Sequence, residues 1–200
     1  MSTHPLIHIK SRRIQISTYD KILDVANIYI QKFGFEGFSY SDLAQELGIK
    51  KASIHYHFPN KMDLGLAYCQ LKREALIQLD QRMSSHTTIQ EKISDYLAAF
   101  AICAEQNMMC GIYAMSSDSA LFSPVLQDQI NDVVQTELNL LEKAFSETQA
   151  TLPCPLNHLE PKALAVMVNS TVKGALMLNR MFKDPQQYTQ TTTALLKMLG

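Results

Sequence analysis

Apolar residues recur at every third or fourth position along almost the whole chain, and this spacing restricts the fold to helices packed on helices. In the first such segment, one face carries Ile22, Ala26, Tyr29, Ile30 and Phe33. A half-buried strand would alternate apolar and polar residues instead, and almost every segment of the chain shows the helical spacing rather than that alternation. We therefore predict an all-α fold of about nine helices with no strand.

Local signals mark where these helices begin and end. Ser39 and Asp42 have the spacing of a capping box, and the same spacing recurs before the first and fourth helices. Gly48 permits the left-handed backbone that ends a helix, and Pro161 suits a first helical turn. These signals place eight of the helices, at about 18–33, 40–47, 51–58, 61–79, 89–104, 124–145, 161–182 and 186–199.

The composition is that of a folded globular chain rather than a disordered, fibrous or membrane-spanning one. Of its 200 residues, 46% are hydrophobic and 18% are charged, with only 7 Gly and 7 Pro. The longest nearly unbroken apolar run, 96–104, is about half of the roughly 20 residues that a membrane-spanning helix needs. Residues 1–16 lack the features of a signal peptide. We therefore expect a cytoplasmic protein with reduced thiols and no membrane partner.

The residue pattern indicates neither a metal site nor catalytic machinery. The four cysteines form no CxxC pair. His55 and His57 are two positions apart, so on a helix their side chains point about 200° from each other and cannot share one metal ion. The chain has no GxSxG, no HExxH and no phosphate-binding glycine loop. We expect no cofactor, no metal and no enzymatic activity.

Charge is distributed unevenly along the chain. The whole chain carries a net charge of −1, but residues 1–61 carry +3 and residues 62–200 carry −4. Six of the eight basic residues in the first part lie in two clusters, one at 10–13 and one at 50–61. Such a local excess indicates one surface that faces phosphates.

Residues 40–58 have the spacing of a helix-turn-helix. Ala44 is small where the two helices must approach each other, and Gly48 provides the tight turn. A miniature core is supplied by Leu43, Leu47, Ile49 and Ile54. On spacing alone, a plain αα-hairpin within a larger bundle remains an alternative.

The flanks of this motif resemble the TetR family of transcriptional regulators. The resemblance covers about residues 18–66, and it lies in the runs 22–26, 34–35 and 42–44 and most specifically in 54–61, Ile-His-Tyr-His-Phe-Pro-Asn-Lys. It implies a three-helix DNA-binding domain at 1–62, in which 1–16 is a flexible basic arm, and a helical ligand-binding and dimerisation domain at 63–200. It also implies a homodimer that binds a palindromic operator as a repressor and is released by a small-molecule inducer.

The resemblance assigns DNA contacts to the second helix of the motif and to its flanks. Lys51 and Ser53 are expected to reach base edges, and Ala52 a thymine methyl group. His55 stands where the family commonly has tyrosine, so its contact is the less defined, whereas the phenol of Tyr56 suits a phosphate oxygen. The complete set of expected DNA-binding residues is Ser39, Tyr40, Lys50, Lys51, Ala52, Ser53, His55, Tyr56 and Lys61.

Residues 89–122 are rich in aromatic and sulfur-containing side chains, which suit an adaptable ligand pocket. The alternative is that these residues form ordinary core. The thiol of Cys110, which precedes Gly111, has two possible roles. It is either a sensor of oxidants or electrophiles, or an inert buried thiol. The expected ligand-binding residues are Tyr96, Phe100, Cys103, Met108, Cys110, Tyr113 and Phe122.

The last two helices, 161–182 and 186–199, are expected to pair with their copies in a second subunit. The first of them is apolar around much of its circumference, although a core helix of a monomer would have the same property. The expected partners are thus operator DNA, an unidentified inducer and a second copy. The competing function is a helical ligand-binding or adaptor protein whose helix-turn-helix does not bind DNA.

Overall fold

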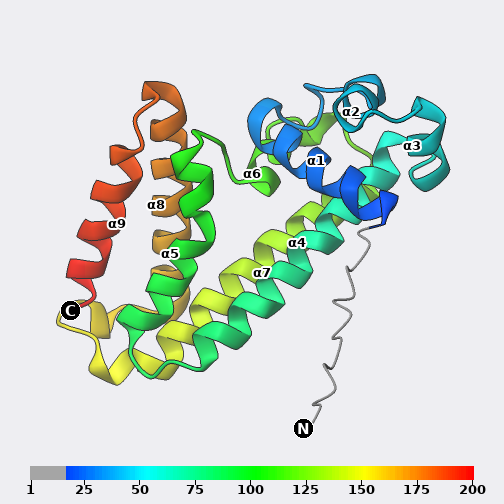
Figure 1. Cartoon of the computed structure of the whole chain (residues 1–200). Helices are drawn as coiled ribbons and strands as arrows, with labels where there is room; N and C mark the ends of the chain where they lie inside the picture. Colours follow the sequence, from blue (N-terminus) through cyan, green and yellow to red (C-terminus); the bar gives the residue numbers. More distant parts are fainter. Residues whose placement is uncertain (1–16) are drawn as a thin grey trace, which may run out of the picture.

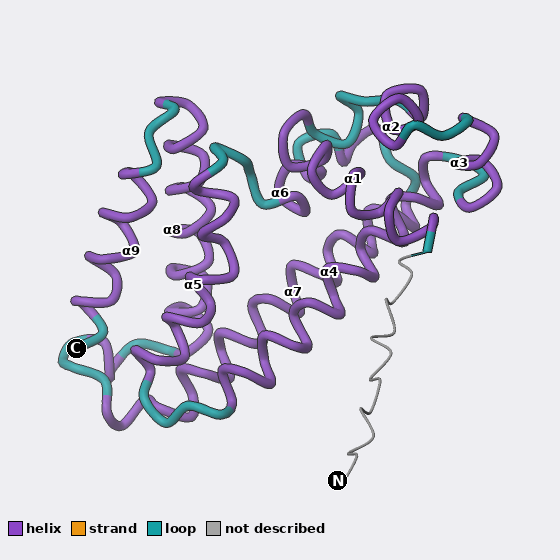
Figure 2. The backbone as a smooth tube through the Cα atoms, in the orientation of Figure 1, coloured by secondary structure: helices purple, strands orange, loops and turns teal. Residues whose placement is uncertain are grey.

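The computed structural model describes residues 17–200, which form nine α-helices, three short 3-10 helices and no strand (Figure 2). This confirms the predicted all-α fold. The predicted basic arm, 1–16, lies outside the described residues. Within residues 17–200, no helix is both long enough and apolar enough to cross a membrane.

The first three helices form a small head at one end of the molecule (Figure 1). They are α1 (Thr18–Phe33), α2 (Tyr40–Leu47) and α3 (Lys51–His57). Ile22, Leu43 and Ile54 contribute one side chain from each helix to its core and are fully buried. Gly48 joins α2 to α3 with φ at 63°, the left-handed conformation expected of it.

The body consists of two long helices that leave the head and three more that pack beside them. The long pair is α4 (Lys61–Ser84) and α7 (Pro124–Thr148), which run side by side (Figure 1). At the far side lie α5 (Ile89–Glu105), α8 (Pro161–Phe182) and α9 (Gln186–Met198). The predicted boundary between head and body near residue 62 stays a prediction, since α4 begins in the head and continues through the body.

Side chains cap the starts of α1, α2 and α4, where the sequence predicted capping; at α1, Ser17 accepts from the Asp20 amide. Both hydrogen bonds of a capping box form between Ser39 and Asp42, and again between Asn60 and Asp63. The hydrogen bonds that the Ser39 hydroxyl and backbone donate to Asp42 lower the pKa of that carboxyl. Each box satisfies amide groups that a helix start would otherwise leave without partners.

The short helix α6 (Gly111–Ser116) lies between the head and the body and has no counterpart among the helix ranges drawn from the sequence. The chain leaves α5 through Asn107, whose φ is 53°. The backbone amide of Met109 then donates to the carbonyl of Gln31 on α1, at 3.1 Å. Six residues are too few to show helical periodicity, and tertiary contacts hold α6 in place.

Gly111 is required by the packing of α6 against α4. A Cβ at this position would overlap the hydroxyl of Tyr68 and would lie 2.9 Å from its Cζ. Tyr68 is fully buried, and its hydroxyl donates to Asn27 on α1. Replacing Gly111 by Ala should therefore lower the free energy of unfolding by about 1–3 kcal/mol through overpacking, as measured by urea denaturation.

The double variant Gly111→Ala, Tyr68→Phe provides the control. It removes the oxygen that the added methyl group would overlap, so it should recover part of the lost stability. A single variant as stable as the natural chain would show that α6 does not pack as described.

Candidate nucleic-acid interface and ligand cavity

The helix α3 lies at the outer end of the head (Figure 1). The side chains on its outward face are polar and exposed to solvent. Lys50, Lys51 and Ala52 are exposed, and Tyr56 is 83% exposed. Ile54, on the opposite side of the helix, is fully buried and anchors α3 in the head. The buried side of α3 thus fixes the direction in which its polar side projects.

His55 is exposed and is held by one hydrogen bond to the backbone. Its Nδ1 lies 3.2 Å from the carbonyl oxygen of Pro59, which can only accept, so Nδ1 carries a hydrogen and Nε2 is left without a partner in the described head. His57 is half-buried and contacts the rings of Tyr19 and Tyr56 edge-on. Within residues 17–200, no group of three or more metal-ligating side chains occurs.

Three of the residues expected to bind DNA use their polar groups inside the head. The hydroxyl of Tyr40 donates to the carbonyl of Asn60 at 2.6 Å, and the side chain is 6% exposed. Burial, and secondarily the charge of Asp63, raise the pKa of this phenol to about 12. Tyr40 therefore ties the start of α2 to the start of α4.

Lys61 and Ser39 have comparable internal roles. The ammonium of Lys61 donates to the carbonyl of Phe38 at 2.8 Å and lies 3.5 Å from the Glu36 carboxylate. The hydroxyl of Ser39 donates to Asp42 as part of the capping box. The capping motif in the sequence already indicated a hydrogen bond within the head for Ser39, whereas no local signal indicated one for Lys61.

A cavity of about 330 Å³ lies within the body, beside the head. It is formed by side chains of α1, α4, α5 and α7 and by the start of α6. Of the residues expected to bind a ligand, Phe100, Cys103 and Cys110 line it. The other lining residues are Gln31, Lys72, Ala75, Leu76, Gln78, Leu79, Arg82, Ala99, Gly111, Ile112, Val133 and Glu137.

A buried ion pair stands at the wall of this cavity. Glu137 Oε1 accepts hydrogen bonds from Lys173 Nζ at 2.6 Å and from the Tyr96 hydroxyl at 2.8 Å. The ammonium of Lys173 also lies 3.3 Å from the centre of the Phe100 ring. Burial raises the pKa of the Tyr96 phenol well above its usual value, with a further contribution from Glu137.

Tyr113 extends the same network, because its hydroxyl donates to Asn169, which in turn donates to the Tyr96 hydroxyl at 3.3 Å. Tyr96 and Tyr113 thus belong to the polar wall rather than to the lining itself. Met108 is buried core, 3% exposed. Phe122 lies away from the cavity, with its ring edge-on to Phe35 of the head, because the chain beyond α6 returns towards the head.

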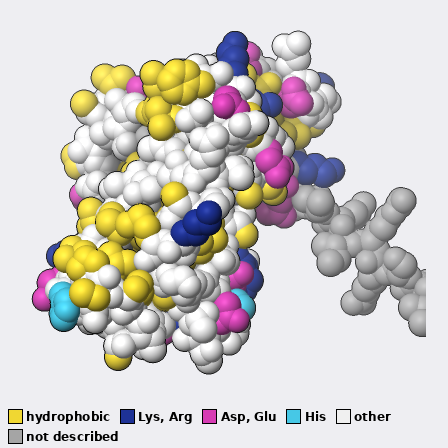
Figure 3. All heavy atoms as spheres, turned by 90° about the vertical axis from the view of Figure 1, so that its left-hand side faces the viewer, with side chains coloured by type: hydrophobic (Ala, Val, Ile, Leu, Met, Phe, Trp, Pro, Cys, Tyr) yellow, Lys and Arg dark blue, Asp and Glu magenta, His cyan; other side chains and the backbone are white. Residues whose placement is uncertain are grey.

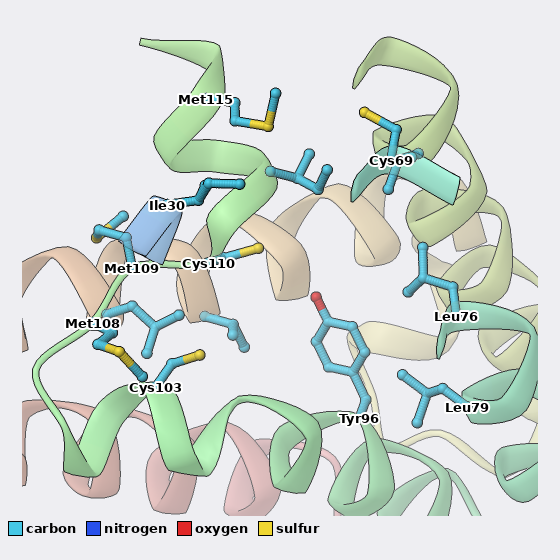
Figure 4. Packing of buried hydrophobic residues seen from close by; sticks show 14 of the residues in the cluster. Ile30, Cys69, Leu76, Leu79, Tyr96, Cys103, Met108, Met109, Cys110 and Met115 are labelled. Carbon is cyan, nitrogen blue, oxygen red and sulfur yellow. The ribbon is translucent and has the colours of Figure 1, made fainter. Parts of the chain in front are cut away.

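The cysteines of the body are all free thiols. Cys103, on α5, and Cys110, just before α6, lie on opposite sides of the break between these helices and are close to each other (Figure 4). Burial raises the pKa of Cys103, and it raises that of Cys69 to about 11, so both thiols are kept protonated.

Sequence reasoning missed the charged residues of the cavity. Glu137 does carry a signal, because it lies four residues from both Val133 and Leu141, on the buried face of α7. Lys173 carries a similar signal, because it is a charged residue among the buried positions of α8. A charge at an apolar position of a helical pattern indicates a buried pair, although the pattern does not name the partner.

Comparison with known proteins decides the family. The sequence-family model described as bacterial regulatory proteins, tetR family, matches residues 22–68. IcaR of Staphylococcus aureus, a negative transcriptional regulator of the biofilm operon icaADBC, is 26% identical over 133 residues, 65% of this chain and 70% of IcaR. A TetR transcriptional regulator from Legionella pneumophila has a TM-score of 0.81 and 28% identity, covering 94% of this chain and 100% of that chain.

The chain belongs to the TetR family. It is therefore a DNA-binding transcriptional regulator, and the family match confirms that it is not an enzyme. The same fold occurs in a solved structure of lower sequence identity. The crystal structure of AibR in complex with isovaleryl coenzyme A and operator DNA has a TM-score of 0.67 and 19% identity, covering 90% of this chain and 97% of that chain.

The same substitution in two tyrosines of the TetR head separates an internal role from a DNA contact. Tyr40→Phe removes the hydrogen bond to Asn60, so it should lower the free energy of unfolding by about 1 kcal/mol. Tyr56→Phe removes a hydroxyl that makes no hydrogen bond within residues 17–200, so stability should be unchanged while DNA binding weakens about tenfold. Urea denaturation and fluorescence anisotropy with labelled duplex measure the two effects.

The reverse pattern, in which Tyr40→Phe weakens DNA binding in a fully stable protein, would contradict the assignment of these two hydroxyls.

Proposed function

We propose that the protein is a homodimeric repressor that binds a two-fold symmetric operator through α3 and is released when a small molecule occupies the body cavity. The observation that carries this proposal is the exposed polar face of α3 on a head whose opposite side is fully packed. The proposal deepens the family assignment by giving roles to particular residues.

On DNA, α3 supplies both base and phosphate contacts. Lys51 and Ser53 lie in its first turn, where the recognition helix of this motif reaches base edges in the major groove. A lysine ammonium donates to guanine O6 or N7, and the methyl group of Ala52 fits a thymine methyl. Lys50, His55 and Tyr56 lie on the flanks, where charge and donors suit phosphates.

The second subunit is proposed to pack on α8 and α9. Along α8, the side chains of Val166, Met177, Met181 and Phe182 are 45–67% exposed, and Met198 on α9 is 52% exposed. Figure 3 shows this side of the molecule, on which hydrophobic side chains gather over a wide area. Monomeric proteins rarely expose such patches, and a two-fold dimer buries the patch of one copy against that of the other.

Gly174 supports a close approach at this surface. A Cβ built there meets no atom within 4 Å, so its small size serves no packing inside the described chain. It is exposed on α8, one turn before Met177 and Leu178. A glycine there lets a second helix come near the backbone of α8.

Release by a ligand requires that the cavity and the head share a moving part. Gln31 is that part, because it belongs to α1 of the head and also lines the cavity. Its side-chain amide donates to the sulfur of Cys103 at 3.4 Å. A ligand that displaces Gln31 or the start of α6 changes the position of α1 and hence of α3, which is the differential contact that coupling between two sites requires.

The experiment that tests this function is selection of a random duplex pool by the purified full-length protein without added ligand. The proposal predicts enrichment of a two-fold symmetric site whose affinity falls steeply with rising salt, because bound phosphates release counterions. Retention of no sequence above background by folded protein would contradict it and favour the adaptor function.

Base recognition is tested with Lys51→Ala on the selected operator. Removing the ammonium should cost about 1–3 kcal/mol and relax the preference at one base pair in each half-site, as measured by repeating the selection. Lys21→Ala, at an exposed position of α1, is the matched control and should leave the preference unchanged. An intact base preference in the Lys51 variant would show that another residue reads that position.

Dimerisation is tested with Met181→Glu. Burying a carboxylate in the proposed interface should convert the dimer to monomer and abolish operator binding, as measured by analytical ultracentrifugation and anisotropy. Leu121→Glu, at an apolar residue that is 77% exposed outside α8 and α9, should leave both properties unchanged. A Met181 variant that stays dimeric would place the interface elsewhere.

A further inference from the structure

The charges around the cavity specify the kind of molecule that it binds. We propose that the inducer is a small amphipathic organic anion, whose anionic group is held by the ammonium of Lys72 and whose apolar part lies against Leu76, Leu79 and Phe100. This inference rests on the proposed function, because it names the ligand class of the same cavity.

Lys72 is one of two cationic lining residues that make no ion pair within residues 17–200, the other being Arg82. Lys72 projects from α4. Its nearest aromatic neighbour is the ring of Tyr68, 5.1 Å from the ammonium. Burial lowers the pKa of Lys72. A desolvated ammonium without a counter-ion is stabilised by any anion that enters.

Arg82 adds a second positive charge along the same helix. Leu76 and Leu79 also line the cavity, and they lie between Lys72 and Arg82 on α4. The helix therefore presents a positive charge at each end of an apolar stretch. The cavity therefore offers an amphipathic molecule an apolar wall with a cation at either end. Its volume of about 330 Å³ lies at the lower end of small-molecule sites.

The lining has one carboxylate, Glu137, and this charge is already balanced. It accepts from Lys173 at 2.6 Å and from Tyr96 at 2.8 Å, both on the same oxygen. Because Glu137 and Lys173 neutralise each other, Lys72 and Arg82 leave the lining with an excess of positive charge. That excess favours an anion over a neutral molecule of the same shape.

A cationic ligand is the competing possibility, since aromatic rings and a carboxylate together suit an ammonium group. In this protein, that position is filled by Lys173, which lies 3.3 Å from the Phe100 ring centre and within 5.6 Å of those of Tyr96 and Tyr113. A cation would have to displace a lysine that is 6% exposed. The geometry therefore favours the anion.

The test compares probes that differ only in charge, with binding to the full-length protein measured by calorimetry. One set is octanoate, octanamide and octylammonium; a second is 2-naphthoate and its amide, so that the result does not depend on one shape. At least one carboxylate should bind about tenfold or more tightly than its amide, which is the strength of one hydrogen bond to a charged group.

Lys72→Met keeps the length of the side chain and removes its charge. The carboxylate should then bind within about twofold of the amide, while binding of the amide itself stays unchanged. Because the natural ammonium is desolvated, this variant should be at least as stable as the natural chain. Lys143→Met is the control: its ammonium is already paired with Asp80 at 2.9 Å outside the cavity, so the preference should persist.

Four results would each overturn the inference. They are equal affinity for carboxylate and amide, tighter binding of octylammonium, no binding of either carboxylate, and a preference for the carboxylate that survives in Lys72→Met. Operator binding without any probe is measured on the same preparations. If the operator is bound normally while the carboxylates fail, the inference alone is wrong; if no operator is bound, the proposed function fails independently.

Discussion

The contact between Gln31 and the segment before α6 joins the DNA-binding head to the body. The Gln31 carbonyl accepts the backbone amide of Met109 at 3.1 Å and a guanidinium hydrogen of Arg180 at 3.4 Å, while its side chain reaches Cys103. One residue of α1 is thereby bonded to three separate parts of the body, and it is 7% exposed. Because Gln31 both belongs to the head and lines the cavity, we propose that a change at one of these sites affects the other.

Polar side chains that are already paired within the protein are less available to a ligand or to DNA than those that are not. In the head, the polar groups of Tyr40 and Lys61 are bonded internally, and for this reason we propose that the exposed side chains of α3 recognise the DNA. In the body, Glu137 is neutralised by Lys173, so the unpaired charge of Lys72 determines the character of the cavity. Both proposed sites are therefore identified in the same way, by the donors, acceptors and charges that have no partner within residues 17–200.

Much of the fold was predictable because helix starts and ends depend on nearby residues. Gly48 and the box of Ser39 with Asp42 fulfilled their expected roles, and the helix from Pro161 ends at Phe182 as predicted. Contacts between distant segments were not predictable: α6 is too short for periodicity, and the bond from Tyr40 to Asn60 joins separate helices. Phe122 was assigned to the cavity because its type suited a pocket, but the path of the chain, which its type does not determine, places it against Phe35.

The central claim is that the cavity and the recognition helix share one coupled structure. Hydrogen–deuterium exchange of the full-length protein, free and bound to its selected operator, tests this most directly without a known inducer. The account predicts slower exchange on DNA not only in α2 and α3 but also at residues 106–112, because the Met109 amide is bonded to α1. Protection confined to α2 and α3, with unchanged exchange around Met109, would contradict the claim.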